Sequence, residues 1–273
     1  MRYRSWLVPV LMAAVAVGGC SAADYTTPER YQQGLVVILG GAGCITSAPR
    51  QICQGLDQGG VGHALEVFEW TGSHDVLEDQ QNIERNRRVA GQLSARLLRY
   101  MGEHPARPVH LIGLSAGTGI VVFALEQLPL GRSVDGACLL ASSVNNNYDL
   151  TRALRRVRNE ITNFSSVADV VVLGVGVGMA GTVDRGTGVS AGIGGFSVPK
   201  EATETAKRLY KEKLVEMPWN PAYVIFGHVG DHLGASSSGF VKHFMAPIVL
   251  DAERRRARGK TPKPASQHRQ ESQ

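Results

Sequence analysis

The chain has little of what a metal or redox protein needs. It contains four cysteines and eight histidines in 273 residues. No two cysteines stand in CxxC spacing, and no histidine cluster has the spacing of metal ligands. We therefore expect no metal ion and no cofactor.

Long uninterrupted apolar runs are also missing. The run over residues 6–17 is too short to span a bilayer as a helix. The stretch over residues 170–196 is crowded with glycine and interrupted by Asp184 and Arg185, which makes it a poor membrane span. We expect a buried helix over residues 170–180, followed by a glycine-rich loop.

Basic residues are not interleaved with aromatic ones, although the net charge is +5. No nucleic-acid partner is therefore expected. The basic residues gather at the C-terminus among proline, glutamine and serine, so we interpret residues 251–273 as a disordered, solvated tail. Its basic residues are Arg254, Arg255, Arg256, Arg258, Lys260, Lys263 and Arg269.

The N-terminus has the layout of an export signal. Arg2 and Arg4 precede the short apolar run, and two glycines follow it before Cys20. Residues 17–20 resemble a bacterial lipobox, in which the cysteine becomes the acylated first residue. An ordinary cleaved signal with a nearby cysteine is the alternative. Residues 1–19 are thus predicted to be a signal peptide, and lipidated Cys20 to hold the protein on a cell-envelope membrane, facing the periplasm or the exterior.

The other cysteines fall into two groups. Cys44 and Cys53 flank a predicted loop and are candidates for a disulfide in an oxidising compartment. Cys138 lies within an apolar strand, where a buried free thiol is expected. None of these features predicts an oligomeric state.

Apolar segments alternate with helical patterns over residues 34–250, after a polar linker at residues 20–33. This alternation predicts one α/β domain with a mostly parallel, doubly wound sheet and helices on both faces. The predicted strands are 35–39, 64–70, 109–114, 134–141, 160–164 and 222–226. The predicted helices are 49–59, 82–100, 117–127, 149–158, 201–216 and 239–250, and residues 71–79 are expected to form a loop.

One short motif follows a buried strand of this pattern. The segment Gly113–Gly117 reads Gly-Leu-Ser-Ala-Gly, and a helical segment comes directly after it. Gly-x-Ser-x-Gly is the sequence of a nucleophile elbow, in which a serine, here Ser115, sits on a tight strand-to-helix turn. The glycines relieve crowding, and the helix N-terminus directs free N–H groups at charge that develops beside the serine.

A serine hydroxyl needs a general base, and the base needs an acid that orients it. After Ser115 the best acid is Asp169, because it follows an apolar strand at the carboxyl edge of the sheet. Asp149 is the alternative acid, although it fits better as the N-terminal residue of a helix. His232 is the preferred base because it lies between the last predicted strand and the last helix, and His228 is the alternative base.

The oxyanion of a tetrahedral intermediate also needs hydrogen-bond donors. One is expected to be the backbone N–H of Ala116, the residue after the nucleophile. The other is expected in the loop Gly40–Gly43 after the first strand, where small residues allow a substrate to come close. We choose Ala42, with Gly41 next.

With these motifs the chain resembles the α/β-hydrolase family over residues 35–250. The resemblance rests on the loop after the first strand, the elbow around Ser115, Asp169 after a late strand and His232 before the last helix. It implies the family's eight-stranded, mostly parallel sheet, here trimmed at its start, with Ser115 as nucleophile, His232 as base and Asp169 as its orienter. The His-Gly pair often found at the family's oxyanion loop is absent from this chain.

The resemblance implies a serine esterase or lipase that cleaves a small-molecule or lipid ester through an acyl-enzyme. Two alternatives stay open. One is a non-catalytic envelope lipoprotein that uses the fold as a binding scaffold, and the other is an acyltransferase that keeps water from the acyl-enzyme. The substrate itself is not predicted, because the loops at residues 71–79 and 174–195 that would select it follow no readable code.

Overall fold

The computed structural model describes residues 24–44, 47–72, 76–169, 182–186 and 189–257. In this part of the chain six strands form one sheet in the order β2-β1-β3-β4-β5-β6, and every neighbouring pair is parallel. The strands are β1 (Leu35–Leu39), β2 (Ala64–Val67), β3 (Val109–Leu114), β4 (Val134–Leu140), β5 (Val157–Ser165) and β6 (Leu214–Pro218).

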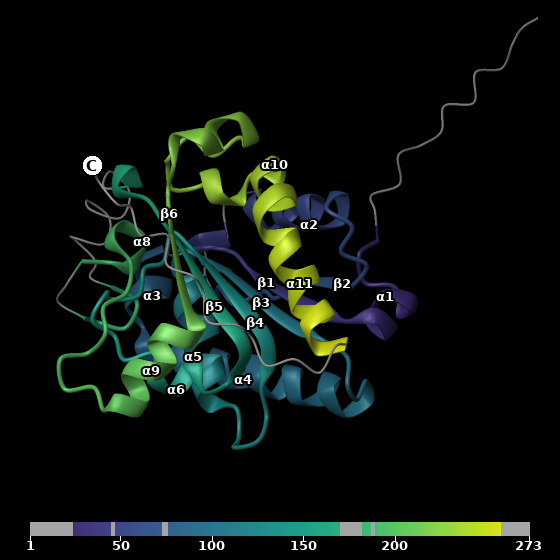
Figure 1. The fold of residues 1–273 in the computed structure, drawn as a ribbon, viewed down its shortest axis with the longest axis horizontal. Helices are drawn as coiled ribbons and strands as arrows, with labels where there is room; N and C mark the ends of the chain where they lie inside the picture. The colour runs from purple at the N-terminus through teal and green to yellow at the C-terminus, as the bar shows by residue number, and fades with distance from the viewer. Residues whose placement is uncertain (1–23, 45–46, 73–75, 170–181, 187–188, 258–273) are drawn as a thin grey trace, which may run out of the picture.

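Helices connect the strands and cover the sheet (Figure 1). The α-helices are α1 (Pro28–Gln33), α2 (Ala48–Gln58), α3 (Val76–Gln81), α4 (Ile83–Glu103), α5 (Gly117–Gln127), α6 (Thr151–Leu154), α8 (Ala191–Gly194), α9 (Glu204–Lys213), α10 (Ser238–Phe240) and α11 (Ala246–Ala257). Shorter 3₁₀ turns are η1 (Ala42–Cys44), η2 (Val167–Asp169), η4 (Pro221–Phe226) and η5 (Gly234–Ser236), and a π-helical turn, η6 (Val241–Met245), joins α10 to α11. Among the described residues, no helix combines the length and the apolar character needed to cross a membrane.

The alternation of side chains along each strand builds a core on both faces of the sheet. In β1, Val37 and Leu39 join the core under α4 and α5, whereas Val36 and Ile38 join the core under α2 and α11. All four side chains are fully buried, as expected for a central parallel strand. Figure 1 shows α11 in front of the sheet and α4 and α5 on its far side.

The direction in which strands are added to the sheet reverses at β1. The chain leaves β1 to add β2 on one side and then returns to add β3 on the other. The loops after β1 and β3 therefore diverge from neighbouring strands at the same edge of the sheet. In open α/β sheets ligands bind outside the carboxyl ends of the strands at such a reversal.

The sequence locates the first four strands and the helices α2, α4 and α5 to within a few residues, and the helix predicted at residues 239–250 covers most of α10, η6 and the first part of α11. It places the last strand wrongly at residues 222–226, because that run forms η4 and the last strand is β6. The side chain of Asn220 caps η4 by accepting a hydrogen bond from the Ala222 amide at 2.9 Å, and Ile225 is left 82% exposed. β6 is an edge strand of half-exposed residues, so its apolar signal is weak.

Two predicted helices are shorter than expected. The segment 149–158 holds only the short α6 before β5 begins, because burial alternates along Val157, Arg158 and Asn159 as it does in a strand. The segment 201–216 holds α9, whose N-terminal cap is Thr203. It ends where β6 begins.

Three segments expected to lack regular structure contain helices. α3 begins inside the predicted loop at residues 71–79 and ends two residues beyond it, α1 lies within the predicted linker, and α11 continues beyond residue 251. Pro28 at the start of α1 and Thr27 as its cap explain the linker helix. The predicted signal peptide, the helix at residues 170–180 and the rest of the tail lie outside the described residues.

Packing between α2 and the last helices generates a stability prediction. A Cβ atom at Gly55 would lie 2.6 Å from the Ser238 carbonyl oxygen and 2.6 Å from Val241 Cβ. We expect Gly55→Ala to lower the free energy of unfolding by about 1–3 kcal/mol, as overpacking does. Urea denaturation followed by circular dichroism measures this change.

Gly102 supplies the matched control, because it lies in α4 with nothing within 4 Å of an added Cβ. Gly102→Ala should raise the free energy of unfolding by about 0.5–1 kcal/mol, since alanine favours a helix over glycine. Equal effects of the two substitutions would contradict the close approach of α2 to α10.

Candidate active site

Ser115 occupies a strained turn between β3 and α5. Its φ angle is +54°, which is unusual for a residue other than glycine. Its amide donates to the Leu140 carbonyl at 2.9 Å, and its carbonyl accepts from the Thr118 amide at 3.0 Å. These bonds hold the strained turn in place, and the side chain stays half-buried at the edge of the sheet.

The two glycines of the motif are needed for close packing. A Cβ at Gly113 would lie 2.9 Å from the Gly117 carbonyl oxygen, and a Cβ at Gly117 would lie 2.4 Å from the Gly40 carbonyl oxygen. The elbow therefore touches both its own helix and the loop after β1. This confirms the close approach expected from Gly-x-Ser-x-Gly.

The loop after β1 lies beside the serine. A Cβ built on Gly41 would be 3.3 Å from Ser115 Cβ and 3.8 Å from Ser115 Oγ. Within the described part of the chain, the amides of Gly41, Ala42 and Ala116 donate no hydrogen bond. Backbone N–H groups near a serine with no partner of their own are what an oxyanion site requires.

Asp169 and His232 form a close pair on the neighbouring part of the same edge. Asp169 ends η2, which follows β5, and His232 lies in the loop between β6 and the last helices. His232 Nδ1 and Asp169 Oδ2 are 2.8 Å apart. The carboxyl side chain is 1% exposed and the imidazole 13% exposed, so the bond is shielded from water.

Burial sets the protonation behaviour of Asp169. It raises the pKa of the carboxyl above its ordinary value, while the hydrogen bond and charge of His232 act in the opposite direction. Oδ1 of Asp169 makes no hydrogen bond to the described residues. The Asp169 carboxylate therefore depends on His232 for much of its stabilisation.

His228, the alternative base, has a structural environment. It is 4% exposed, stacks on Tyr223 with ring centroids 6.2 Å apart and meets Phe240 edge-on at 4.9 Å. Its Nδ1 accepts from the Gly230 amide at 3.3 Å. Burial lowers the pKa of His228 to about 4, so at neutral pH the ring is uncharged and holds the loop before His232.

The structure brings some of the predicted site residues together and leaves others apart. Asp169 meets His232, and the loop after β1 meets Ser115. Ser115 Oγ is not hydrogen-bonded to His232 among the described contacts, and such bonds are often long until substrate binds. Asp149 is exposed, and its Oδ1 accepts from the Thr151 amide at 2.9 Å in a turn that precedes α6.

The disulfide considered between Cys44 and Cys53 is absent, because Cys53 is a free thiol. Its side chain faces the core under α2, and burial raises its pKa to about 11. Cys138 is also buried and free, as the sequence predicts. Within the described ranges, no group of three or more His, Cys, Asp or Glu side chains could hold a metal ion.

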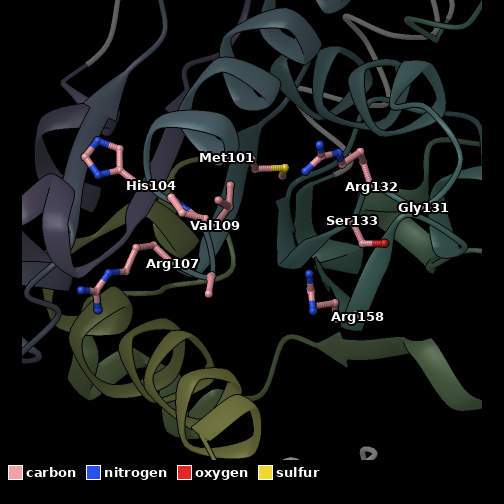
Figure 2. A pocket seen from close by; sticks show the side chains of 10 residues that line it. Met101, His104, Arg107, Val109, Gly131, Arg132, Ser133 and Arg158 are labelled. Atoms are coloured by element: carbon pink, nitrogen blue, oxygen red, sulfur yellow. The ribbon is translucent and has the colours of Figure 1, made fainter.

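Two surface hollows lie away from the site, near the amino ends of the strands. One, of about 130 Å³, lies between the end of α4 and the starts of β4 and β5. Figure 2 shows Arg132 and Arg158 on one side of it and His104 and Arg107 on the other. The second hollow lies under α11. Neither is lined by Ser115, Asp169 or His232, so neither is taken as the catalytic cleft.

Sequence reasoning missed a set of residues that hold the loop after β1. Trp70, Asp79 and Arg85 contact that loop or each other, and they come from the end of a predicted strand, the end of a predicted polar loop and the start of a predicted helix. An aspartate at the end of a polar stretch gives no sequence signal of burial. A lone tryptophan after a short strand was the one available hint.

The chain has remote likenesses among solved structures. Est1E from Butyrivibrio proteoclasticus is 13% identical, with a TM-score of 0.46 over 83% of this chain and 90% of that chain. LpqC, a poly(3-hydroxybutyrate) depolymerase from Bordetella parapertussis, is 14% identical, with a TM-score of 0.44 over 87% and 84%. The esterase Est2 from Thermogutta terrifontis is 11% identical, with a TM-score of 0.43 over 88% of each chain. No family model and no curated protein matches the chain.

These likenesses are too remote to assign an activity. The chain's own order of strands, with the serine elbow after β3 and the histidine and aspartate after later strands, defines the architecture. The fold is a parallel, doubly wound α/β sheet with helices on both faces. The predicted fold class is confirmed, whereas the roles of the site residues are argued from their geometry.

The environment of His228 generates a prediction about pH. The unfolded chain binds a proton at His228 below its ordinary pKa of 6.5, but the folded protein does so only near pH 4. The contribution of neutral His228 to the free energy of unfolding is therefore fully present above pH 6.5. This contribution falls as the pH drops toward 4, by at most about 1.4 kcal/mol per pH unit. Urea denaturation at pH 7 and pH 5 measures the loss.

The variants His228→Phe and His228→Gln serve as comparisons, because neither titrates. Each should lose less stability than the wild type between the two pH values. A loss in both variants that equals the wild-type loss would contradict the buried, uncharged state of His228.

Proposed function

We propose that the protein is a serine hydrolase that cleaves an ester, with Ser115 as nucleophile, His232 as general base and Asp169 as its orienter. The observation that carries this proposal is the shielded bond of 2.8 Å between His232 Nδ1 and Asp169 Oδ2. It lies at the same edge of the sheet as the strained Ser115 turn. An imidazole fixed through Nδ1 presents Nε2 as the base.

The reaction begins when an ester carbonyl approaches Ser115. Oγ attacks the carbonyl carbon while Nε2 of His232 takes the hydroxyl proton. The negative charge that develops on the carbonyl oxygen accepts hydrogen bonds from the amides of Ala116 and Ala42. Collapse of the tetrahedral intermediate transfers the proton from His232 to the departing alkoxide and leaves an acyl group on Ser115.

Water then enters and completes the cycle. His232 takes a proton from the water molecule, whose oxygen attacks the acyl carbonyl, and a second tetrahedral intermediate forms. The proton returns to Ser115 Oγ as the acid product leaves. Throughout, Asp169 holds the imidazole orientation and stabilises its protonated form, which a buried carboxylate with one hydrogen-bond partner can do.

The cellular setting of this activity is a second proposal. The signal-peptide layout of residues 1–19 and the lipobox-like sequence before Cys20 support an exported, lipid-anchored protein of the cell envelope. An anchor of this kind sets the location of the enzyme and does not select between a small-molecule ester and a lipid ester.

Labelling with a fluorophosphonate probe tests the proposed activity, because such probes react with serines that a base activates. The wild type should be labelled and Ser115→Ala should not be. Ser133→Ala is the control and should be labelled like the wild type, since Ser133 lies near the amino end of β4 and lines the hollow in Figure 2.

Failure of the wild type to label under any condition would overturn the proposal and favour a non-catalytic scaffold. Labelling that survives in Ser115→Ala would overturn the choice of nucleophile. Product analysis with competing alcohols separates hydrolysis from acyl transfer. A hydrolase gives mainly the free acid, and an acyltransferase gives mainly a new ester.

A further inference from the structure

The loop after β1 is fixed at both of its ends by buried side chains. At one end, the indole Nε1 of Trp70 donates to the Gly40 carbonyl at 2.7 Å. At the other end, Asp79 Oδ2 accepts from the Gly43 amide at 2.9 Å. Trp70 is 3% exposed and Asp79 is 0% exposed, so water does not compete with either bond.

Arg85 ties these two anchors together. Its Nη1 donates to Asp79 Oδ1 at 2.9 Å and its Nη2 donates to the Trp70 carbonyl at 2.6 Å. The side chain of Asn86 donates to the Asp79 carbonyl at 2.7 Å. The Asp79 side chain is 1% exposed and the Arg85 side chain 15% exposed, so this is a nearly buried ion pair with its hydrogen bonds satisfied.

Holding a surface loop with a buried ion pair carries a large desolvation cost. Removing two charges from water costs much of what their attraction returns, so a buried ion pair is poor evidence for stability alone. It fixes geometry well, however, because both carboxylate oxygens of Asp79 and both terminal nitrogens of Arg85 have defined hydrogen-bond partners. Geometry is what the loop beside Ser115 requires.

These contacts also determine which backbone amides of the loop are free to bind a substrate. Asp79 occupies the Gly43 amide, so that group is not available to a substrate. Between the two anchored ends, the amides of Gly41 and Ala42 have no partner among the described residues. Gly41 is in contact with Ser115. One of the two free donors therefore belongs to a residue beside the nucleophile, and the other belongs to the next residue of the loop.

We propose that Trp70, Asp79 and Arg85 form an oxyanion-loop clamp, a set of positioning residues that aims the Ala42 amide, with Gly41 beside it, at the carbonyl oxygen attacked by Ser115. The clamp rests on the proposed hydrolase activity and adds to it the reason why the amides of Gly41 and Ala42, and not that of Gly43, are free to bind the oxyanion. None of the three side chains touches the substrate in this scheme.

Steady-state kinetics of Asp79→Asn with an activated ester test the clamp. The neutral side chain loses its ion pair with Arg85, and its single oxygen replaces the two carboxylate oxygens that accept separately from Arg85 and from the Gly43 amide. Removal of one oxyanion donor lowers kcat by about 10²–10³-fold, and a displaced donor should cost about 10- to 100-fold in kcat with KM changed less than about twofold. The pH profile of kcat/KM should keep its midpoint, since Asp169 and His232 are untouched.

Trp70→Phe gives a second, milder test, because it keeps an aromatic ring and removes only the N–H that holds Gly40. It should lower kcat in the same direction by a smaller factor. If Asp79→Asn does not fold, the kcat of Trp70→Phe still tests the positioning role. Fluorophosphonate titration counts active sites in each preparation, so kcat is expressed per active site.

Asp135→Asn is the matched control. Asp135 is also a buried aspartate that accepts from a backbone amide, that of Val109 at 2.9 Å, but it lies at the start of β4, beside the end of β3 that is opposite to Ser115. This variant should lose stability and keep the wild-type kcat per active site.

Three results would overturn the clamp. Wild-type kcat in folded Asp79→Asn and in Trp70→Phe removes the positioning role while leaving the hydrolase activity intact. Equal losses of kcat in Asp79→Asn and Asp135→Asn show a general effect of stability. A wild type that neither labels nor turns over any ester refutes the hydrolase activity itself, and with it the catalytic meaning of the clamp.

Discussion

The contact between the loop after β1 and the turn after β3 is the constraint on which the site depends. The Gly40 carbonyl lies where a Cβ of residue 117 would be, and the loop continues past Ser115 with another glycine against the serine side chain. β1 and β3 are hydrogen-bonded neighbours. The loops that follow them therefore lie side by side, whatever their sequences. Glycine at positions 41 and 117 allows the elbow and the loop after β1 to pack this closely.

The other half of the site, the pair of Asp169 and His232, depends on the burial of charged and titratable side chains. Asp169 and His232 come from the far side of β4, where β5 and β6 end, and their bond is enclosed by the loop that His228 stabilises. The two histidines of this loop are four residues apart in sequence and differ in surroundings. His228 is packed among aromatic rings, which keeps it neutral, whereas His232 pairs with a carboxylate. Environment, more than sequence position, separates the structural histidine from the candidate base.

Much of this arrangement could be predicted from sequence because it depends on local patterns. A buried parallel strand reads as a continuous apolar run, so β1, β3 and β4 were located almost to the residue. The elbow motif placed Ser115, and chain order pointed to Asp169 and His232. Side-chain pairing between distant segments could not be read in the same way. The clamp formed by Trp70, Asp79 and Arg85 depends on three-dimensional contacts that leave no periodic trace.

The errors have the same origin. The run at residues 222–226 has the composition of a strand, but proline and an asparagine cap begin a 3₁₀ helix there and its aromatic residues pack against the last helices. Cys53 has a suitable distance in sequence from Cys44, but it faces the core under α2. In both cases tertiary packing decided between two conformations that the local sequence allowed.

The central claim is that Ser115, His232 and the two amides converge on one reacting carbonyl. A crystal structure of the fluorophosphonate adduct measures this convergence directly, because the phosphonyl oxygen occupies the place of the oxyanion. The account predicts phosphorus bonded to Ser115 Oγ, with the phosphonyl oxygen about 2.7–3.1 Å from the amide nitrogens of Ala42 and Ala116. An adduct on another residue, or a phosphonyl oxygen turned away from both amides, would contradict it.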